Sequence, residues 1–254
     1  TLNVPDEQGG FRPATGIGQM YRIDESSGEV IAIEQMIRVF GSRPIRNRAT
    51  LGGNLCTASP IGDMAPVLLA LEAEAIVAGS AGERRLPLED FFAGYRETSL
   101  RDDEVLVAVF LPKPASDNLV RAYKISRRRD LDISAVSLGV SLRLNEDQTV
   151  ARIRLAYGGV AATTIRARAV EDWLQGKAWN HANVEAAADQ LEALFSPMSD
   201  HRGSETFRRR LSGNLLRQFW SDLVTNRDPF APWDAPWTQL PVPPRAQKDG
   251  DFPS

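Results

Sequence analysis

The chain of 254 residues contains one cysteine, Cys56, and two histidines, His181 and His201. A single thiol cannot form a disulfide within the chain, and an iron–sulfur cluster normally needs about four cysteine ligands. The two histidines are too few and too far apart to suggest a metal site without other ligands. The sequence therefore excludes an internal disulfide and an iron–sulfur cluster held by this chain alone, and it offers no candidate metal centre.

Long apolar runs and a strong charge of one sign are also missing. The apolar run at residues 105–111 is far too short to span a bilayer, and no signal-peptide pattern opens the chain. Thirty lysines and arginines against 33 aspartates and glutamates give a formal net charge of −3, which does not favour nucleic-acid binding. Local basic clusters at 127–129 and 208–210 are typical of solvated surfaces. We therefore expect a cytoplasmic enzyme component of one large or two ordinary domains.

The sequence also lacks a Ser/His/Asp or Cys/His arrangement, so any chemistry is expected to belong to a bound cofactor. What it has instead is a glycine-containing segment at residues 45–63. Gly52 and Gly53 can adopt positive φ and bring consecutive N–H groups close to an anion. The alternative is an ordinary Gly-Gly turn. Polar and basic side chains that would add donors or positive potential to such a loop are Thr50, Asn54, Thr57, Ser59, Arg46 and Arg48.

Hydrophobic periodicity predicts a mixed first half. Asp63 stands in the N-cap position before a predicted helix. The expected elements are helices at 33–40 and 64–74, a hairpin of 74–78 and 83–88, a helical turn at 88–95 and a strand at 104–111. The proline-containing stretch at 112–115 then marks a domain boundary.

The second half predicts three antiparallel strands followed by three helices, a small sheet covered on one face. The strands are expected at 119–127, 133–144 and 149–157, with a hairpin turn at 145–148, and the helices at 166–175, 182–195 and 204–223. Residues 224–254 are rich in proline and tryptophan, which predicts an extended tail without a core of its own.

Segment 45–63 resembles the second flavin-contacting loop of the FAD domain in molybdenum hydroxylases, the group that includes xanthine and carbon monoxide dehydrogenases. The resemblance covers roughly residues 37–222, and the Arg-Arg pair, the Tyr-Gly-Gly turn and the Asp-x-Arg-Gly-Ser segment favour the bacterial xanthine dehydrogenase small subunit. Further segments that match in the family's order are 88–98, 103–106, 123–130, 156–162 and 199–204. The implied fold class is α+β, with a truncated FAD-binding (PCMH-type) domain followed by a small antiparallel sheet covered by helices.

The resemblance implies four segments: an unaligned N-terminal segment at 1–30, a partial FAD-binding domain at 31–113, a CO dehydrogenase flavoprotein-like C-terminal domain at 114–223 and the tail at 224–254. The family's first pyrophosphate-contacting loop, of Gly-Gly-Thr-Asp type, has no counterpart in residues 1–30. Three explanations stay open: the chain is a fragment or shortened product, the missing half-site is supplied elsewhere, or flavin binding is weakened.

The resemblance also implies which residues contact the flavin. Asp63 would contact the cofactor, although an N-cap alone would explain an aspartate there. Phe40 and Leu106 would contact the adenine and the flavin ring system, although both are core residues by pattern. The full set of implied cofactor-binding residues is Phe40, Thr50, Leu51, Gly52, Gly53, Asn54, Cys56, Asp63, Leu106 and Lys124.

Four residues are implied to act near the reacting part of the flavin. Lys124 would place a positive charge near the isoalloxazine and stabilise the anionic reduced flavin, whereas by pattern alone it is a solvated lysine. Tyr95, Arg96 and Arg128 would line the approach of the nicotinamide, whereas by pattern alone they are an exposed aromatic residue and two surface arginines.

The leading hypothesis is that the chain is the FAD-bearing part of a xanthine dehydrogenase-type complex. A partner large subunit would carry the molybdenum cofactor, and [2Fe-2S] centres in a partner subunit or domain would pass electrons to FAD, which would reduce NAD⁺. We expect a hetero-oligomer without nucleic-acid or membrane partners. Two alternatives stay open: a cofactor-less assembly module, and the medium subunit of a carbon monoxide or aromatic-substrate dehydrogenase.

Overall fold

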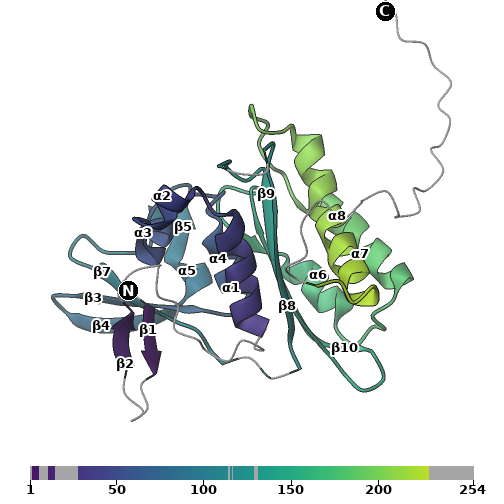
Figure 1. Ribbon diagram of the computed structural model, residues 1–254, viewed down its shortest axis with the longest axis horizontal. Helices are drawn as coiled ribbons and strands as arrows, with labels where there is room; N and C mark the ends of the chain where they lie inside the picture. The colour runs from purple at the N-terminus through teal and green to yellow at the C-terminus, as the bar shows by residue number, and fades with distance from the viewer. Residues whose placement is uncertain are drawn as a thin grey trace, which may run out of the picture.

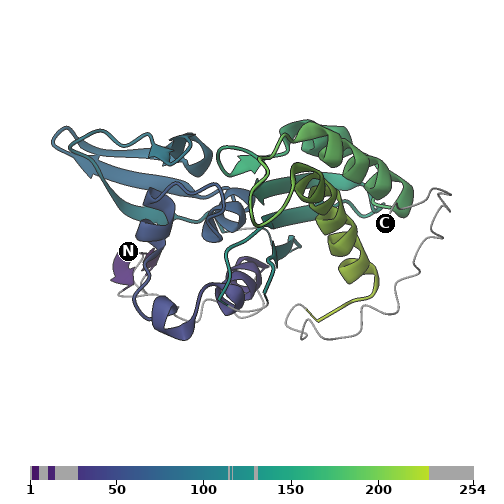
Figure 2. The same ribbon diagram turned by 90° about the horizontal axis from the view of Figure 1, so that it is seen from above.

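The computed structural model describes residues 2–5, 11–14, 28–113, 115, 117–128 and 131–228, with side chains from residue 31 onward. The predicted segments at 1–30 and 224–254 therefore lie for the most part outside the described residues. Helices α1 to α5 and strands β3 to β7 form one end of the molecule, and strands β8 to β11 with helices α6 to α8 form the other (Figures 1 and 2). Within the described part, no helix is long and apolar enough to cross a bilayer.

The first half is built from short elements. The predicted helix at 33–40 is confirmed as α1, which begins earlier, and the predicted hairpin and strand form an antiparallel sheet in the order β4–β3–β7. Helix α4 ends earlier than predicted because Glu72 has a φ of +55°, which a right-handed helix cannot continue. The elements are β1 Leu2–Pro5, β2 Phe11–Ala14, α1 Gly28–Val39, α2 Arg43–Arg46, α3 Leu51–Cys56, α4 Met64–Ala70, β3 Glu74–Gly79, β4 Gly82–Pro87, α5 Leu88–Phe91, β5 Phe92–Gly94, β6 Glu97–Thr98 and β7 Val105–Phe110.

The second half contains the predicted strands and helices in the predicted order. A short additional strand, β11, extends the sheet to four antiparallel strands in the order β11–β10–β9–β8. The elements are β8 Leu119–Ile125, β9 Val136–Leu144, β10 Val150–Gly158, β11 Ile165–Arg166, α6 Arg168–Leu174, α7 His181–Leu194 and α8 Glu205–Val224.

Both faces of this sheet are covered, whereas the sequence predicted helices on one face only. Larger apolar side chains of β9 and β10, such as Leu138 and Leu155, face helices α6 to α8. The opposite face receives α1 and α4 from the first half, so the sheet lies between two helical layers (Figure 1). We call the contact of α1 and α4 with the sheet the seam. The prediction was wrong because strand periodicity does not reveal that a preceding segment of the same chain covers the second face.

Small residues let helix α4 lie directly on the sheet. Every residue of α4 is buried, and the helix contacts β9 and β10. A Cβ atom at Gly139 of β9 would overlap the Pro66 carbonyl and lie 2.8 Å from the Val67 Cα, while one at Gly158 would lie 3.3 Å from the Pro66 side chain. The seam therefore depends on a backbone-to-backbone approach that larger residues would prevent.

Strand β8 joins the two layers because its side chains alternate between the faces. Tyr123 points toward α8 and donates its hydroxyl hydrogen to Asp222 at 2.8 Å. Burial, together with the Asp222 carboxylate, raises the pKa of Tyr123 well above its usual value. The next residue, Lys124, points to the seam instead, where it meets groups from the first half.

Candidate functional site

The glycine segment forms a short helix and not the predicted loop of positive φ. Gly52 and Gly53 lie in the first turn of α3, and neither is among the residues with positive φ. Thr50 is the N-cap, and its hydroxyl accepts a hydrogen bond from the Gly53 N–H at 2.9 Å. The prediction of a turn with positive φ was wrong because a capping threonine outweighs the low helix propensity of two glycines when the helix is this short.

The arginines before this helix do not act alike. Arg46 donates its Nη1 hydrogens to the Phe40 carbonyl at 2.7 Å and the Gly41 carbonyl at 3.1 Å, which ties the end of α1 to α2. Arg48 is exposed. Of the two arginines predicted to supply positive potential, Arg46 thus also has a structural role. Phe40, which follows α1, is half-buried.

Asn54 carries an unused hydrogen-bonding group. Its side-chain oxygen is buried and has no hydrogen-bond partner among the described residues. It would lie 3.7 Å from a Cβ at Gly62, the residue before Asp63. Because buried polar atoms are usually paired, this oxygen is a candidate contact for a bound molecule or water.

Leu106 and Gly52 meet although they are 54 residues apart in the numbering of the chain. A Cβ at Gly52 would lie 4.0 Å from the Leu106 Cδ2, an ordinary van der Waals contact. Leu106 is partly buried, while Val105 beside it is 63% exposed. Leu106 packs against the core of the first half, as its pattern predicts, but its strand is only partly buried because β7 is an edge strand with one sheet neighbour, β3.

Cys56 ends helix α3 and is a surface residue. Partial burial of its thiol raises the pKa, so the thiol is less readily ionised than a fully solvated cysteine. Leu51, at the other end of the helix, is half-buried.

A buried ion pair crosses the seam. Lys124 Nζ lies 2.7 Å from Asp63 Oδ2 and 3.1 Å from the Val39 carbonyl oxygen, and the Lys124 and Asp63 side chains are only 3% and 8% exposed. The Ser134 hydroxyl donates to the other carboxylate oxygen at 2.5 Å. Asp63 occupies the N-cap position of α4 but makes no side-chain capping bond, and Lys124 is not solvated. The predicted N-cap position of Asp63 is confirmed, but its side chain pairs with Lys124 and does not cap the helix, and the interpretation of Lys124 as a solvated lysine was wrong.

Ser134 and Asp132 are candidate site residues that sequence reasoning missed. Asp132 accepts hydrogen bonds from the Arg128 N–H at 2.8 Å and from the Ile133 N–H at 2.9 Å. Donation by the Arg128 N–H is the largest cause that lowers the pKa of Asp132, and the Arg128 and Lys124 charges contribute in the same direction. The Asp-x-Ser spacing shortly after the basic cluster at 127–129 was the available signal.

The residues predicted to line the nicotinamide approach lie on two separate turns. Tyr95 and Arg96 form the turn between β5 and β6, where Tyr95 is 53% exposed and Arg96 has a φ of +58°. Arg128 follows β8, and its side chain is 73% exposed. None of the three takes part in the Asp63–Lys124 ion pair.

The Tyr-Gly-Gly and Asp-x-Arg-Gly-Ser motifs meet at a buried arginine. Arg208 donates to the Ala135 and Gly159 carbonyls, and its Nη2 lies 2.7 Å from Asp200 Oδ1. Burial opposes ionisation of Asp200, but the Arg202 N–H and Arg208 lower its pKa to about 2. The Gly159 N–H also donates to the Pro60 carbonyl at 2.7 Å, which links these motifs to the loop before Asp63.

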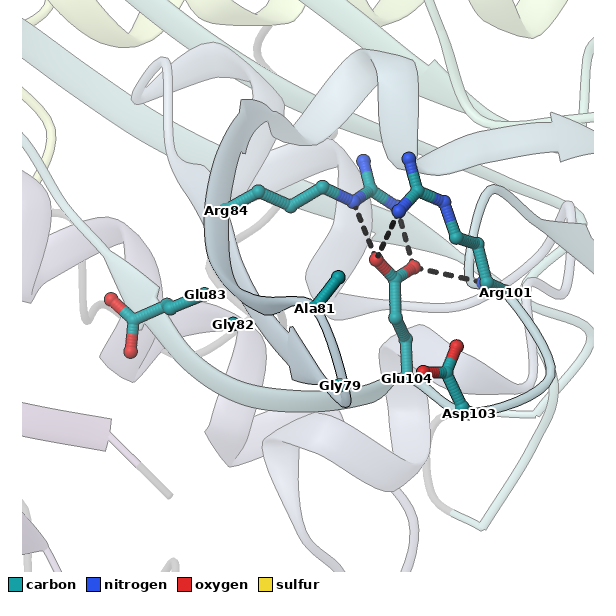
Figure 3. A pocket seen from close by; sticks show the side chains of 8 residues that line it. All are labelled: Gly79, Ala81, Gly82, Glu83, Arg84, Arg101, Asp103 and Glu104. Carbon is teal, nitrogen blue, oxygen red and sulfur yellow. Dashed lines mark hydrogen bonds and ion pairs between the residues drawn. The ribbon is translucent and has the colours of Figure 1, made fainter.

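A small pocket lies beside the β3–β4 hairpin, and none of the predicted site residues lines it (Figure 3). Arg84 donates to both Glu104 oxygens, at 2.8 and 2.7 Å, and the Arg101 N–H donates at 2.8 Å. Hydrogen bonding from Arg84 is the largest cause that lowers the pKa of Glu104 to about 2. Glu104 is thus paired within the pocket lining, by Arg84 and Arg101.

Two family models match most of the chain. Residues 14–114 match the FAD binding domain in molybdopterin dehydrogenase, and residues 121–223 match the CO dehydrogenase flavoprotein C-terminal domain. The seam lies between elements of the first matched segment and the sheet of the second.

Similar curated proteins include a nicotinate hydroxylase from Emericella nidulans, 38% identical over 202 residues, which are 77% of this chain and 15% of that protein. A xanthine dehydrogenase from Blastobotrys adeninivorans is 36% identical over 213 residues, which are 81% of this chain and 15% of that protein. The chain thus spans about 15% of the length of these relatives.

Solved structures share the fold. A carbon monoxide dehydrogenase from Hydrogenophaga pseudoflava aligns with a TM-score of 0.73 and 28% identity, over 80% of this chain and 68% of that one. Quinoline 2-oxidoreductase from Pseudomonas putida 86 aligns with a TM-score of 0.68 and 28% identity, over 76% of this chain and 66% of that one. The predicted α+β fold class is confirmed.

Proposed function

Because the chain belongs to the FAD-binding flavoprotein components of the molybdenum hydroxylase family, we propose that it holds FAD at the seam and passes electrons from other centres to NAD⁺. The domain boundary falls at residues 112–115, between the partial FAD-binding domain and the C-terminal domain. The whole complex would be of the xanthine dehydrogenase type, with molybdenum and iron–sulfur centres in partner subunits or domains. This assignment rests on the xanthine dehydrogenase relatives and on the predicted motifs together.

The observation that carries the proposal is a chain of contacts joining the predicted cofactor-binding residues. Gly52 adjoins Leu106, Asn54 adjoins the residue before Asp63, and Asp63 binds Lys124. Phe40 follows the Val39 carbonyl, which accepts from Lys124. These residues come from α1, α3, the loop before α4, β7 and β8, so one ligand could contact several elements at once.

The chemistry of these groups fits a flavin nucleotide. The unpaired Asn54 oxygen can accept a hydrogen bond from a ribose or amide group, and Thr50, Leu51, Gly53 and Cys56 belong to the same capped helix. Half-buried apolar side chains at Phe40 and Leu106 can cover aromatic rings.

Lys124 would orient and charge-stabilise the cofactor from the seam. A lysine has three donors, and two of them bind Asp63 and the Val39 carbonyl, so one remains for a ligand. Bound FAD would supply acceptance of electrons and their delivery as hydride. Since Asp63 offsets part of the Lys124 charge, we expect a smaller effect on the reduction potential than from an unpaired lysine.

Tyr95, Arg96 and Arg128 would guide NAD⁺ to the open flavin face. Tyr95 offers an exposed ring for stacking on the nicotinamide, while Arg128 offers an exposed guanidinium for a phosphate. Asp132 would support this by binding the backbone of Arg128.

The decisive experiment is the visible absorption spectrum of the purified chain after incubation with FAD, with chromatography of the released cofactor. We expect one FAD per chain, and Asn54→Ala to weaken binding by about tenfold, the loss of one hydrogen bond to a ligand. Asn214→Ala, on the exposed side of α8, is the matched control and should bind normally. A chain that never retains FAD, alone or with its partner subunits, overturns the proposal and favours a cofactor-less docking module.

A carbon monoxide or aromatic-substrate dehydrogenase medium subunit is a second candidate, favoured by the structural likeness to carbon monoxide dehydrogenase and quinoline 2-oxidoreductase. Assembled complexes that reduce NAD⁺ with xanthine support the first candidate. Activity with an aromatic heterocycle or carbon monoxide, but not xanthine, supports the second.

A further inference from the structure

Helix α4 is held by charged groups of the second half at both of its ends. At its start, Asp63 binds Lys124 and Ser134. Just past its end, Glu72 binds two arginines of β10: its Oε1 lies 2.6 Å from Arg152 Nη2 and 2.8 Å from Arg154 Nε. At about 1.5 Å per residue, the step from Asp63 to Glu72 separates these two groups of ion pairs by roughly 13 Å.

The apolar contact between these two groups of ion pairs specifies the position of the helix along its axis less sharply than the ion pairs do. The residues of α4 are apolar and all are buried, and the helix lies on β9 and β10 where Gly139 and Gly158 carry no side chain. Apolar contact is non-directional and favours burial more than one particular sliding position. Hydrogen-bonded ion pairs at the two ends do specify a position, because a shift along the axis would lengthen them.

Contacts within the second half fix the side chain of Arg154. Its Nη1 donates to the Ile153 carbonyl at 2.9 Å and lies 3.9 Å from the buried Glu171 carboxylate. Glu171 is fixed in turn, because it accepts from the Leu155 N–H at 2.7 Å. Arg154 is therefore held in position on β10 by contacts within the second half, and Glu72 binds it from the first half.

We propose that Glu72 is a positioning residue: bound by Arg152 and Arg154, it fixes helix α4 along its axis and so keeps Asp63 within hydrogen-bonding distance of Lys124. The Glu72 and Arg152 side chains are 35% and 48% exposed, so their pair contributes little to overall stability. Glu72 would therefore act on the geometry of the seam more than on folding. The consequence for a bound flavin rests on the proposed function, whereas the consequence for Lys124 does not.

The test measures how well Lys124 is protected. Acetic anhydride acylates only a neutral, accessible amine, so paired and buried Lys124 should react far more slowly than exposed Lys113, with mass spectrometry reporting both. In the full chain, Glu72→Gln should raise the Lys124 rate relative to Lys113 by up to about fivefold, the change that ~1 kcal/mol of lost pairing gives. Glu74→Gln is the matched control, since Glu74 pairs with Arg85 inside the first half and should leave Lys124 protected.

Exchanging the charges of Glu72 and Arg152 distinguishes a positioning role of Glu72 from a general loss of stability. Glu72→Arg should expose Lys124, and adding Arg152→Glu should restore part of its protection, because Arg154 still repels the introduced positive charge. Equal Lys124 rates in wild type, Glu72→Gln and Glu74→Gln overturn the proposal, as does failure of the exchange to rescue. If Glu72→Gln does not fold, Arg152→Gln removes one of the two arginine partners. It must then raise the Lys124 acylation rate as well, but by less.

The reduction potential of bound flavin provides the second measurement. Glu72→Gln should shift it in the same direction as Lys124→Met, and Glu74→Gln should not. A wild-type chain that binds no flavin overturns the proposed function only, because the acylation experiment still tests Glu72.

Discussion

The Asp63–Lys124 pair at the seam and the Glu104–Arg84 pair beside the β3–β4 hairpin use the same chemistry in two settings. Each carboxylate is nearly buried, at 8% and 5% side-chain exposure. Arg84 and Glu104, however, lie in one family-matched segment, whereas Asp63 and Lys124 come from two. The hairpin pair joins β4 to the segment before β7 within the first half, whereas the seam pair joins the two family-matched segments. The segments that an ion pair joins, more than its residue types, therefore decide which contacts are lost when the pair is broken.

The largest expected difference comes from breaking the seam pair. Lys124→Met leaves the Asp63 carboxylate buried with Ser134 as its remaining partner, so the free energy of unfolding should fall by about 3–5 kcal/mol in urea denaturation at neutral pH. Lys113→Met, at an exposed lysine, should change it by less than ~0.5 kcal/mol. Adding Asp63→Leu to Lys124→Met should recover much of the loss. A loss below ~1 kcal/mol would show that the pair is not buried as described.

A second, smaller effect tests the close approach of α4 to the sheet. Gly139→Ala should lower the free energy of unfolding by about 1–3 kcal/mol, because its Cβ meets the backbone of Pro66 and Val67. Gly52→Ala is the control: its Cβ finds ordinary contact with Leu106, and alanine favours the helix by about 0.5–1 kcal/mol. Thermal or urea unfolding measures both variants. Equal effects would mean that α4 is not seated against β9.

The smallest effect concerns the hairpin pair in acid. The pKa of Glu104 is lowered from 4.5 to about 2, so its contribution is complete above pH 4.5 and is lost as the pH falls toward 2. The difference in urea midpoint between wild type and Glu104→Gln should therefore shrink across this window. Glu83→Gln, at an exposed glutamate of the same pocket, should show no such trend. A difference independent of pH would contradict the assigned role of Arg84.

The sequence was most informative where one physical pattern dominates. Strand alternation in β9, with Leu138 and Val140 facing one layer and Gly139 the other, predicted both the strand and its apolar face. Helices α6, α7 and α8 were also predicted within two residues of their ends. These elements are long enough for periodicity to outweigh local exceptions.

Predictions from local sequence pattern failed where capping or tertiary contacts determine the conformation or the partner of a residue. Gly52 and Gly53 carry no periodic signal, and a single cap at Thr50 converts them from an expected turn into a helix. Asp63 has the sequence context of a cap, yet its carboxylate binds a lysine 61 residues away. The family resemblance nominated Asp63 and Lys124 for one site, but no spacing rule reveals that they bind each other, nor that Ser134 joins them.

The close seating of α4 on Gly139 has a consequence for how the chain unfolds. A helix that is buried along its whole length between its own half and the sheet of the other half cannot leave the sheet without exposing apolar surface on both sides. We therefore expect the two family-matched segments to unfold together, as one cooperative unit. A boundary drawn at residues 112–115 divides the sequence, and separate expression of either side would leave a layer of the core facing water.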